Sequence, residues 1–426
     1  MLGIVRVATT CLVLLSLLSV VGVVLWSDVF THGMSFATLT GQMSRQRSGQ
    51  RSGQRSNHGH AVPKFVAPHL YDLQTRKELD IMNMSMLTFN QAFKNPCWWE
   101  TSLEDNTCVT IRKDPRGMMG RARRHLKKHK RVLRCLPYFQ IVGQAKCGTT
   151  DLFSKLLKHP HALPTLLKET QWVSRVRTDR FCSRLNTYVD YFQKSANRIT
   201  REKRHKAIIG EATPSYLSVN RFWNLLPGNE GCSEPCVTNA DIIHHLNPKT
   251  RIIIILRNPT DRLYSYYFHV KRLRKESAHQ REFHQLVIQE VAEYQDCLKT
   301  STPRLCAYND TFTSFKKTDL RRGIYSIFVK DWMKIYPADQ ILILRFEDYK
   351  NKVEEHLQQI FSFLDLMPLS QKKLKSIATS AVKNRRKTSS RKIGDMWPVT
   401  RNVLDRFYKP YNGQLSSLLQ NERFHW

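Results

Sequence analysis

The sequence predicts an α/β protein with a P-loop-like three-layer fold around a central parallel sheet, preceded by an N-terminal transmembrane helix and a flexible stem. Three observations support this. From Leu136 onward, short apolar runs alternate with amphipathic stretches, which is the pattern of strands alternating with helices. Val7–Trp26 is an uncharged run long enough to cross a bilayer. Between these regions, the polar repeat Gln-Arg-Ser-Gly from Gln46 to Ser56 has no apolar face to bury.

The composition excludes a disordered chain and points to an anionic partner. The 426 residues are 41% hydrophobic, which is enough for one large core or two ordinary ones. Lys and Arg number 68 against 35 Asp and Glu, a formal charge of +33. Such an excess favours nucleic acid, an anionic polysaccharide or an acidic membrane surface as partner.

The apolar run near the N-terminus is interpreted as an uncleaved signal anchor. Arg6 precedes it and Asp28 follows it. A cleaved signal peptide is the alternative, but its apolar region is usually only about 7–15 residues long. The predicted organisation is a cytoplasmic tail at 1–6, an anchor at 7–26, a stem at 27–64, a lumenal extension at 65–135 and a catalytic domain at 136–426.

A lumenal body should carry glycans and disulfides. Asn83 and Asn309 each begin an Asn-X-Ser/Thr sequon. Nine cysteines follow the membrane run, an odd number that leaves at least one unpaired. The closely spaced pairs are expected to form local disulfides: Cys97 with Cys108, Cys232 with Cys236, and Cys297 with Cys306. Zinc is disfavoured because no second ligand pair stands at suitable spacing.

An anion-binding loop follows the first strand of the catalytic domain. Leu136–Gly143 is expected to be a buried strand, and Gln144–Thr150 then opens a helix. Backbone N–H groups of a glycine-bearing turn, the helix N-terminus and the Lys146 ammonium would converge on one phosphate. A Walker loop would require Gly-Lys-Ser/Thr, whereas Lys146 precedes Gly148 here. The same difference removes the usual magnesium ligand, so no metal is implied.

A second element makes the pattern specific. Arg251–Pro259 is a run of apolar residues closed by Arg257, and a helix containing Ser265 follows. With the loop, it resembles the carbohydrate sulfotransferases that use 3′-phosphoadenosine 5′-phosphosulfate (PAPS). The resemblance covers nearly all of residues 136–419 and implies a Golgi-membrane, single-pass type II enzyme. It assigns the 5′-phosphosulfate to Lys146, Cys147, Gly148, Thr149 and Thr150, and the 3′-phosphate to Arg257 and Ser265.

The resemblance also implies a division of catalytic roles. Sulfuryl transfer needs a cation at the leaving phosphate and a base at the attacking hydroxyl. Lys146 would be the cation, and Glu169, in a Lys-Glu pair after the first helix, the base. Lys168 and His269 are candidate substrate-binding residues, although a solvated lysine and a structural histidine are equally good interpretations.

The expected acceptor is a sulfated glycosaminoglycan. The arrangement is most similar to the family members that sulfate the 6-hydroxyl of N-acetylgalactosamine 4-sulfate in chondroitin or dermatan sulfate. Ala212 stands where heparan sulfate relatives usually carry Lys, which counts against a heparan acceptor. The alternatives are a sulfotransferase for another glycosaminoglycan such as heparan sulfate and a catalytically silent glycosaminoglycan binder. No nucleic acid is expected, because the anchor and sequons place the body where nucleic acid is absent and no known binding motif appears. A homodimer is left open. Two basic segments, 121–134 and 383–392, are candidates for gripping the acceptor.

Overall fold

The computed structural model describes residues 81–101, 131–177, 185–310, 318–383 and 393–426. The chain divides into a unit at 1–65 and a unit at 66–426, and every described residue belongs to the second. Within these ranges, no helix combines the length and the apolar character needed to span a membrane. The predicted anchor and stem lie outside the described residues.

A five-stranded sheet forms the centre of the molecule. Its strands run in the order β4 (Ala162–Leu163), β5 (Ile208–Ala212), β3 (Phe139–Gly143), β6 (Arg251–Leu256) and β7 (Ile341–Arg345). Every neighbouring pair is parallel. The prediction of a central parallel sheet is therefore confirmed, although β3 starts three residues later than the apolar run indicates.

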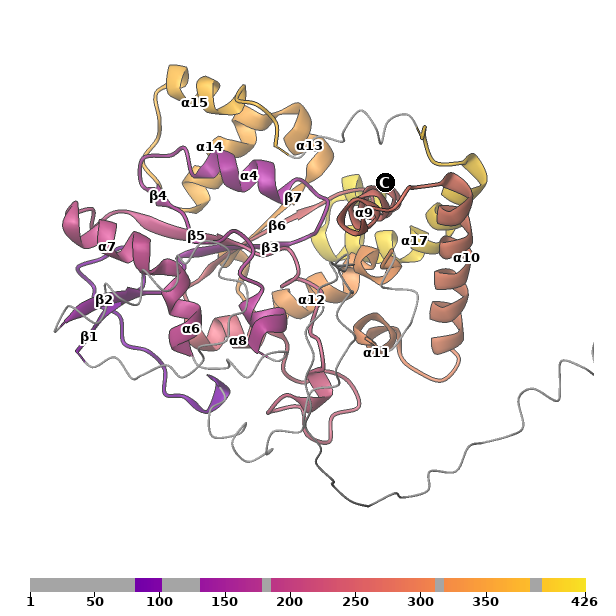
Figure 1. Cartoon of the computed structure of the whole chain (residues 1–426), viewed down its shortest axis with the longest axis horizontal. Coiled ribbons are helices and arrows are strands. Elements are labelled where there is room, and N and C mark those ends of the chain that lie inside the picture. The colour runs from indigo at the N-terminus through magenta and orange to yellow at the C-terminus, as the bar shows by residue number, and fades with distance from the viewer. Residues whose placement is uncertain (1–80, 102–130, 178–184, 311–317, 384–392) are drawn as a thin grey trace, which may run out of the picture. The chain divides into compact units, whose positions relative to one another are not determined.

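Side chains alternate between two apolar layers along β6, as the period of a strand requires. Ile253 and Ile255 join one core cluster, while Ile252, Ile254 and Leu256 join the other. Figure 1 shows helices on both faces. The first cluster is covered by α4 (Thr149–Leu156), α13 (Phe346–Asn351), α14 (Val353–Phe363) and α15 (Gln371–Ala378). The second is covered by α6 (Leu185–Val189), α7 (Gln193–Arg201), α8 (Asn239–Leu246) and α12 (Tyr325–Ile335).

A third apolar cluster lies among helices beyond the sheet (Figure 1). It is built by α9 (Pro259–Arg274), α10 (Gln280–Cys297), α11 (Pro303–Tyr308) and α17 (Pro398–Leu419). Short helices connect the larger elements: η1 (Ile81–Asn83), η2 (Trp172–Val176), η3 (Asp190–Phe192), η4 (Trp223–Leu225), η6 (Leu320–Gly323), η7 (Ala338–Gln340) and η8 (Glu422–His425).

One of the three predicted disulfides is wrong. Cys97 bonds to Cys135, not to Cys108, which lies outside the described residues. The reason is strand pairing: β1 (Cys97–Glu100) and β2 (Val132–Cys135) are antiparallel, and their register places Cys97 opposite Cys135. Spacing along the chain favours a local loop, but the register of the two strands brings a cysteine 38 residues away within bonding distance.

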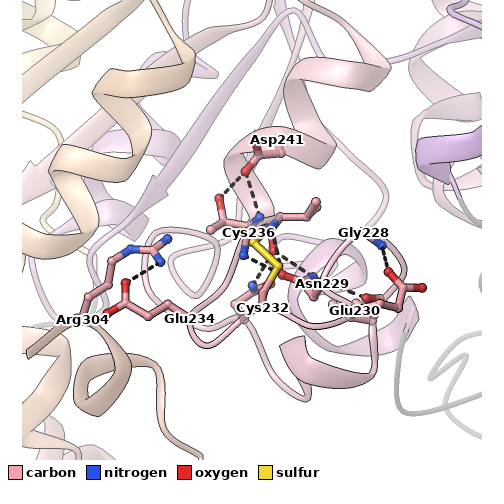
Figure 2. The surroundings of a disulfide bond; sticks show 12 residues. Gly228, Asn229, Glu230, Cys232, Glu234, Cys236, Asp241 and Arg304 are labelled. Atoms are coloured by element: carbon pink, nitrogen blue, oxygen red, sulfur yellow. Dashed lines mark hydrogen bonds and ion pairs between the residues drawn. A yellow bond between two sulfur atoms is a disulfide. The ribbon is translucent and has the colours of Figure 1, made fainter. Parts of the chain in front are cut away.

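The other two disulfides are confirmed, namely Cys232 with Cys236 and Cys297 with Cys306. Figure 2 shows the first. Its loop is held by the Asn229 side chain, whose Oδ1 accepts hydrogen bonds from the backbone N–H groups of Cys236 (2.8 Å) and Val237 (2.9 Å). Among the described cysteines, Cys147 is free, in agreement with the odd count.

The predicted basic segment at 121–134 enters the described residues only at its end. There Arg134 is buried on β2, where its guanidinium pairs with Glu100 (3.1 Å) and Asp190 (2.8 Å). This arginine is therefore part of the core and not available to an acceptor. Most of the second basic segment, 384–392, also lies outside the described residues.

Candidate active site

The predicted site residues come from the carboxyl ends of the parallel strands, which meet at one edge of the sheet. The anion loop follows β3, Arg257 follows β6, and Phe346 follows β7. Lys168 and Glu169 lie in the connection after β4. The sheet thus brings together side chains that are about a hundred residues apart in the sequence.

The loop after β3 is held in place by hydrogen bonds of the Gln144 side chain. The Gln144 side chain donates to Ser218 Oγ (2.9 Å) and to the Arg322 carbonyl (3.2 Å), and its Oε1 accepts from the Ala145 N–H (2.7 Å). Gly148 has a φ of 89°, and a Cβ there would lie 2.8 Å from the Phe346 ring. Glycine is therefore required by both conformation and space.

Cys147 is a structural member of this loop. Its thiol is fully buried, and burial raises its pKa to about 11. It lies 3.9 Å from Tyr325 Oη. A neutral, enclosed thiol is a poor nucleophile, and the contact of Cys147 with the donor stays a prediction.

Tyr325 and Phe346 join the two predicted phosphate sites. Tyr325 Oη donates to the Arg257 carbonyl (2.8 Å) and lies 3.9 Å from Cys147 Sγ. The Arg257 guanidinium lies 5.3 Å from the centre of the Phe346 ring, which also packs beside Gly148. The loop and Arg257 consequently form one assembly and not two separate surface features.

Ser265 lies on α9, roughly two helical turns after Arg257. The helix begins after Asn258, whose side chain accepts a hydrogen bond from the Asp261 N–H (3.2 Å). The Asn258 N–H in turn donates to Glu347 (2.9 Å). Ser265 is half-buried, and these contacts fix the start of the helix that carries it.

Lys146 is the electrostatic centre of the site. Burial, followed by the charges of Arg272 and Arg257, lowers the pKa of its ammonium, while Glu169 opposes the change. Lys146, Arg257, Arg272 and Glu169 therefore interact in one region. Three cations close together repel one another, so an anion of multiple charge would stabilise them.

Glu169 is held by its neighbours on both sides. Its carboxylate pairs with Lys168 (2.5 Å) and is 40% exposed, so it remains accessible to a substrate. The next residue, Thr170, donates to the buried carboxylate of Glu211 (2.5 Å), which also accepts from Thr213 and Tyr216 (both 2.9 Å). This network fixes the segment that presents Glu169.

His269 lies beside Lys146 and Arg272. Burial and these two charges lower the pKa of His269 to about 4, so the ring is neutral at physiological pH. Arg272 Nη2 lies 3.2 Å from His269 Nδ1. Because arginine can only donate, Nδ1 is the acceptor and Nε2 carries the proton. His269 is thus a neutral hydrogen-bond donor near the site.

Several residues at the site were missed by sequence reasoning. Tyr325, Phe346 and Glu211 act as supports, and Arg272 adds a cation. Arg272 follows His269 by three residues on a predicted helix, so helical spacing was a usable signal for it. Nothing local in the sequence marks the other three as neighbours of the loop.

The remaining predicted residues lie elsewhere. Asn83 is exposed at the end of η1, and Asn309 is partly exposed after α11. Over the ranges that the structure describes, His, Cys, Asp and Glu form no group of three or more that could hold a metal ion.

The chain is similar in sequence to known sulfotransferases. Residues 238–402 match the model of the sulfotransferase domain. Carbohydrate sulfotransferase 15 of Mus musculus is 33% identical over 395 residues, covering 84% of this chain and 69% of that protein. Bifunctional heparan sulfate N-deacetylase/N-sulfotransferase 3 of Homo sapiens is 24% identical, covering 67% and 30% respectively. A sulfotransferase structure from Alicyclobacillus acidocaldarius has a TM-score of 0.44 at 23% identity, covering 67% and 97%.

The parallel sheet brings two cationic sites together at one edge, and the matched domain is that of sulfotransferases, which transfer sulfuryl groups. The similarity to the mouse protein extends over most of both chains. The chain belongs to the carbohydrate sulfotransferase family, of which carbohydrate sulfotransferase 15 is a member.

Proposed function

We propose that this enzyme transfers a sulfuryl group from PAPS to the 6-hydroxyl of N-acetylgalactosamine 4-sulfate in chondroitin or dermatan sulfate. The observation that carries the proposal is the joining of the two anion sites. Lys146 and Arg257 interact electrostatically, and Tyr325 and Phe346 contact both the loop and the Arg257 segment.

The residues present fit a donor with phosphates at two ends. The loop offers Lys146, backbone N–H groups and the N-terminus of α4 with Thr149 and Thr150. Arg257 and Ser265 offer a planar fork and a neutral hydroxyl for the second phosphate. Gly148 gives the loop its positive φ and leaves room for the Phe346 ring, which packs where a Cβ would lie.

Different side chains of the enzyme would then take different roles in the transfer. The donor supplies the sulfuryl group. Glu169 removes the proton from the acceptor hydroxyl, and its pairing with Lys168 orients the carboxylate. Lys146 neutralises charge that develops at the leaving phosphate. His269, neutral and protonated at Nε2, donates a hydrogen bond without adding a charge.

A heparan acceptor is less favoured. The heparan sulfate relative has lower identity and a shorter matched share than carbohydrate sulfotransferase 15. Ala212, at the position where the heparan enzymes usually carry Lys, is buried in an apolar cluster at the end of β5. This position therefore offers no cation to a heparan chain.

We also propose the Golgi lumen as the location, with residues 7–26 as a type II anchor. The sequence supports this through the length of the apolar run. The three disulfides among the described residues support an oxidising compartment.

The test is a transfer assay with the full chain in detergent, radiolabelled PAPS and a panel of acceptors. Chondroitin 4-sulfate should be labelled at the 6-hydroxyl, as shown by disaccharide analysis. Labelling of heparan sulfate alone would refute the acceptor. No labelling of any polysaccharide, with nucleotide binding intact, would instead indicate a silent binder.

Two variants test the assigned roles. Glu169→Gln should lower kcat by roughly 10²–10⁴-fold, as expected for loss of a general base, with unchanged binding of adenosine 3′,5′-bisphosphate. Arg257→Ala should weaken that nucleotide by roughly 10–100-fold, since it loses a charged hydrogen-bonding partner. Calorimetry separates the two outcomes, and loss of nucleotide binding by Glu169→Gln would contradict its role as base.

A further inference from the structure

Three arginines that the donor site does not use come together beside the reaction centre. Arg175 lies in η2, six residues after Glu169. Arg221 lies in the connection between β5 and η4, and Arg322 lies in η6. They come from three separate segments of the chain, so no helical face or charge run explains their proximity.

Arg322 adjoins the anion loop directly. Its carbonyl accepts from the Gln144 side chain (3.2 Å), and its guanidinium pairs with Asp319 (2.5 Å). The guanidinium also lies 5.5 Å from the centre of the Tyr266 ring. Tyr266 is 6.2 Å from the His269 ring, so one aromatic side chain separates Arg322 from the residues around Lys146.

Arg175 lies within electrostatic range of Arg322 and Arg221. The preceding residue, Ser174, shares a hydrogen bond with Ser215 (2.8 Å), which ties η2 to the connection that leads to Arg221. Burial, with the charges of Arg322 and Arg221, lowers the pKa of the Arg175 guanidinium, and Asp319 opposes the change. Charged side chains from two other segments of the chain therefore act on Arg175.

We propose that Arg175, Arg221 and Arg322 bind the sulfate ester already present on the acceptor sugar, and so direct its free hydroxyl toward Glu169. This rests on the proposed function. Guanidinium groups form paired hydrogen bonds with oxyanions, and a tetrahedral sulfate can engage several of them at once. A planar carboxylate of a uronic acid accepts hydrogen bonds from fewer directions than a tetrahedral sulfate does. Three arginines from separate segments therefore suit a sulfate better than a carboxylate.

The geometry of the acceptor agrees with this division. In a galacto-configured sugar, the 4-sulfate on C4 and the hydroxymethyl group on C5, which carries the 6-hydroxyl, lie on the same side of the ring. C4 and C5 are neighbouring ring carbons. Binding one therefore limits where the other can be. Glu169 and Arg175 belong to one short segment, which the contacts of Thr170 with Glu211 and of Ser174 with Ser215 hold in place.

The test compares acceptors in variants of the full chain. Arg175→Gln and Arg221→Gln should raise the KM for chondroitin 4-sulfate by roughly 10–100-fold, the loss expected for a charged hydrogen bond. Their kcat/KM for unsulfated chondroitin and their affinity for adenosine 3′,5′-bisphosphate should stay unchanged. Arg322→Lys, which keeps the charge beside Asp319, should lose less than Arg322→Gln.

The matched control is Arg201→Gln on α7, an exposed arginine paired with Glu202, which should leave both acceptors unaffected. An equal fall on sulfated and unsulfated chondroitin would overturn the sulfate subsite. So would an unchanged KM for carboxyl-reduced chondroitin 4-sulfate in these variants, because the subsite would then read the carboxylate.

The same assay separates this proposal from the proposed function. If the wild-type enzyme labels no chondroitin at all, the proposed function fails. If it labels sulfated and unsulfated chondroitin with equal kcat/KM, the enzyme is still a chondroitin sulfotransferase but the arginine cluster is not a sulfate subsite.

Discussion

The buried carboxyl of Glu290 on α10 should make the stability of the enzyme depend on pH. Burial, with the nearby charge of Asp319, raises its pKa from 4.5 to about 7, even though three groups donate hydrogen bonds to it. The donors are the Thr318 hydroxyl and the N–H groups of Asp319 (3.1 Å) and Leu320 (2.7 Å). Glu290 thus holds the segment that leads to Arg322.

The sign follows from proton binding. Between pH 4.5 and about 7, the folded state binds more protons at Glu290 than the unfolded state. Stability therefore falls as pH rises through this window and is constant above it. The difference in pKa corresponds to about 3 kcal/mol in all, of which about 2 to 3 kcal/mol falls between about pH 5 and about pH 8.

The perturbation is Glu290→Gln, which keeps the shape but removes the titration. The difference in melting temperature between wild type and variant should change by about 5 °C between about pH 5 and about pH 8. Thermal unfolding followed by intrinsic fluorescence measures it, and other titrating groups cancel because both proteins share them. Parallel melting curves at the two pH values would refute the reasoning.

Two further substitutions test the supports of the donor site. Tyr325→Phe removes the donor to the Arg257 carbonyl, at a cost of about 1 kcal/mol. Calorimetry should therefore show roughly 5-fold weaker binding of adenosine 3′,5′-bisphosphate. Unchanged affinity would contradict the idea that Tyr325 positions Arg257 for the nucleotide. Gly148→Ala must place a Cβ against Phe346 at positive φ, and nucleotide affinity should fall by roughly 10-fold or more. Gly231→Ala, also at positive φ but with open space around it, is the matched control and should leave affinity unchanged.

Much of the site could be predicted from the sequence because anion binding leaves local marks. A strand, a turn with Lys146 and Gly148, and a helix start are contiguous, and so are β6, Arg257 and α9. A parallel sheet then brings the two segments to the same edge, since β3 and β6 are neighbours. The sheet and both anion elements were predictable for these reasons.

The supports and the disulfide at Cys97 were not predictable, because they depend on contacts distant in sequence. Tyr325 lies at the start of α12, and nothing in the apolar period of a helix distinguishes a core tyrosine from one that donates to Arg257. Cys97 bonds to Cys135 because of the register of two short strands, although the two cysteines are 38 residues apart in the sequence. Neither relation has a signal in local spacing.

The bond between Cys97 and Cys135 closes a loop that contains many lysines and arginines, among them Arg112, Lys113, Arg116 and Arg121. A trypsin-like protease that cut there would not release the N-terminal part. The two fragments would travel as one species on a denaturing gel and separate only after a reductant was added. A nicked enzyme would thus keep β1 beside β2, and any anchor upstream of it would stay covalently attached to the catalytic fragment.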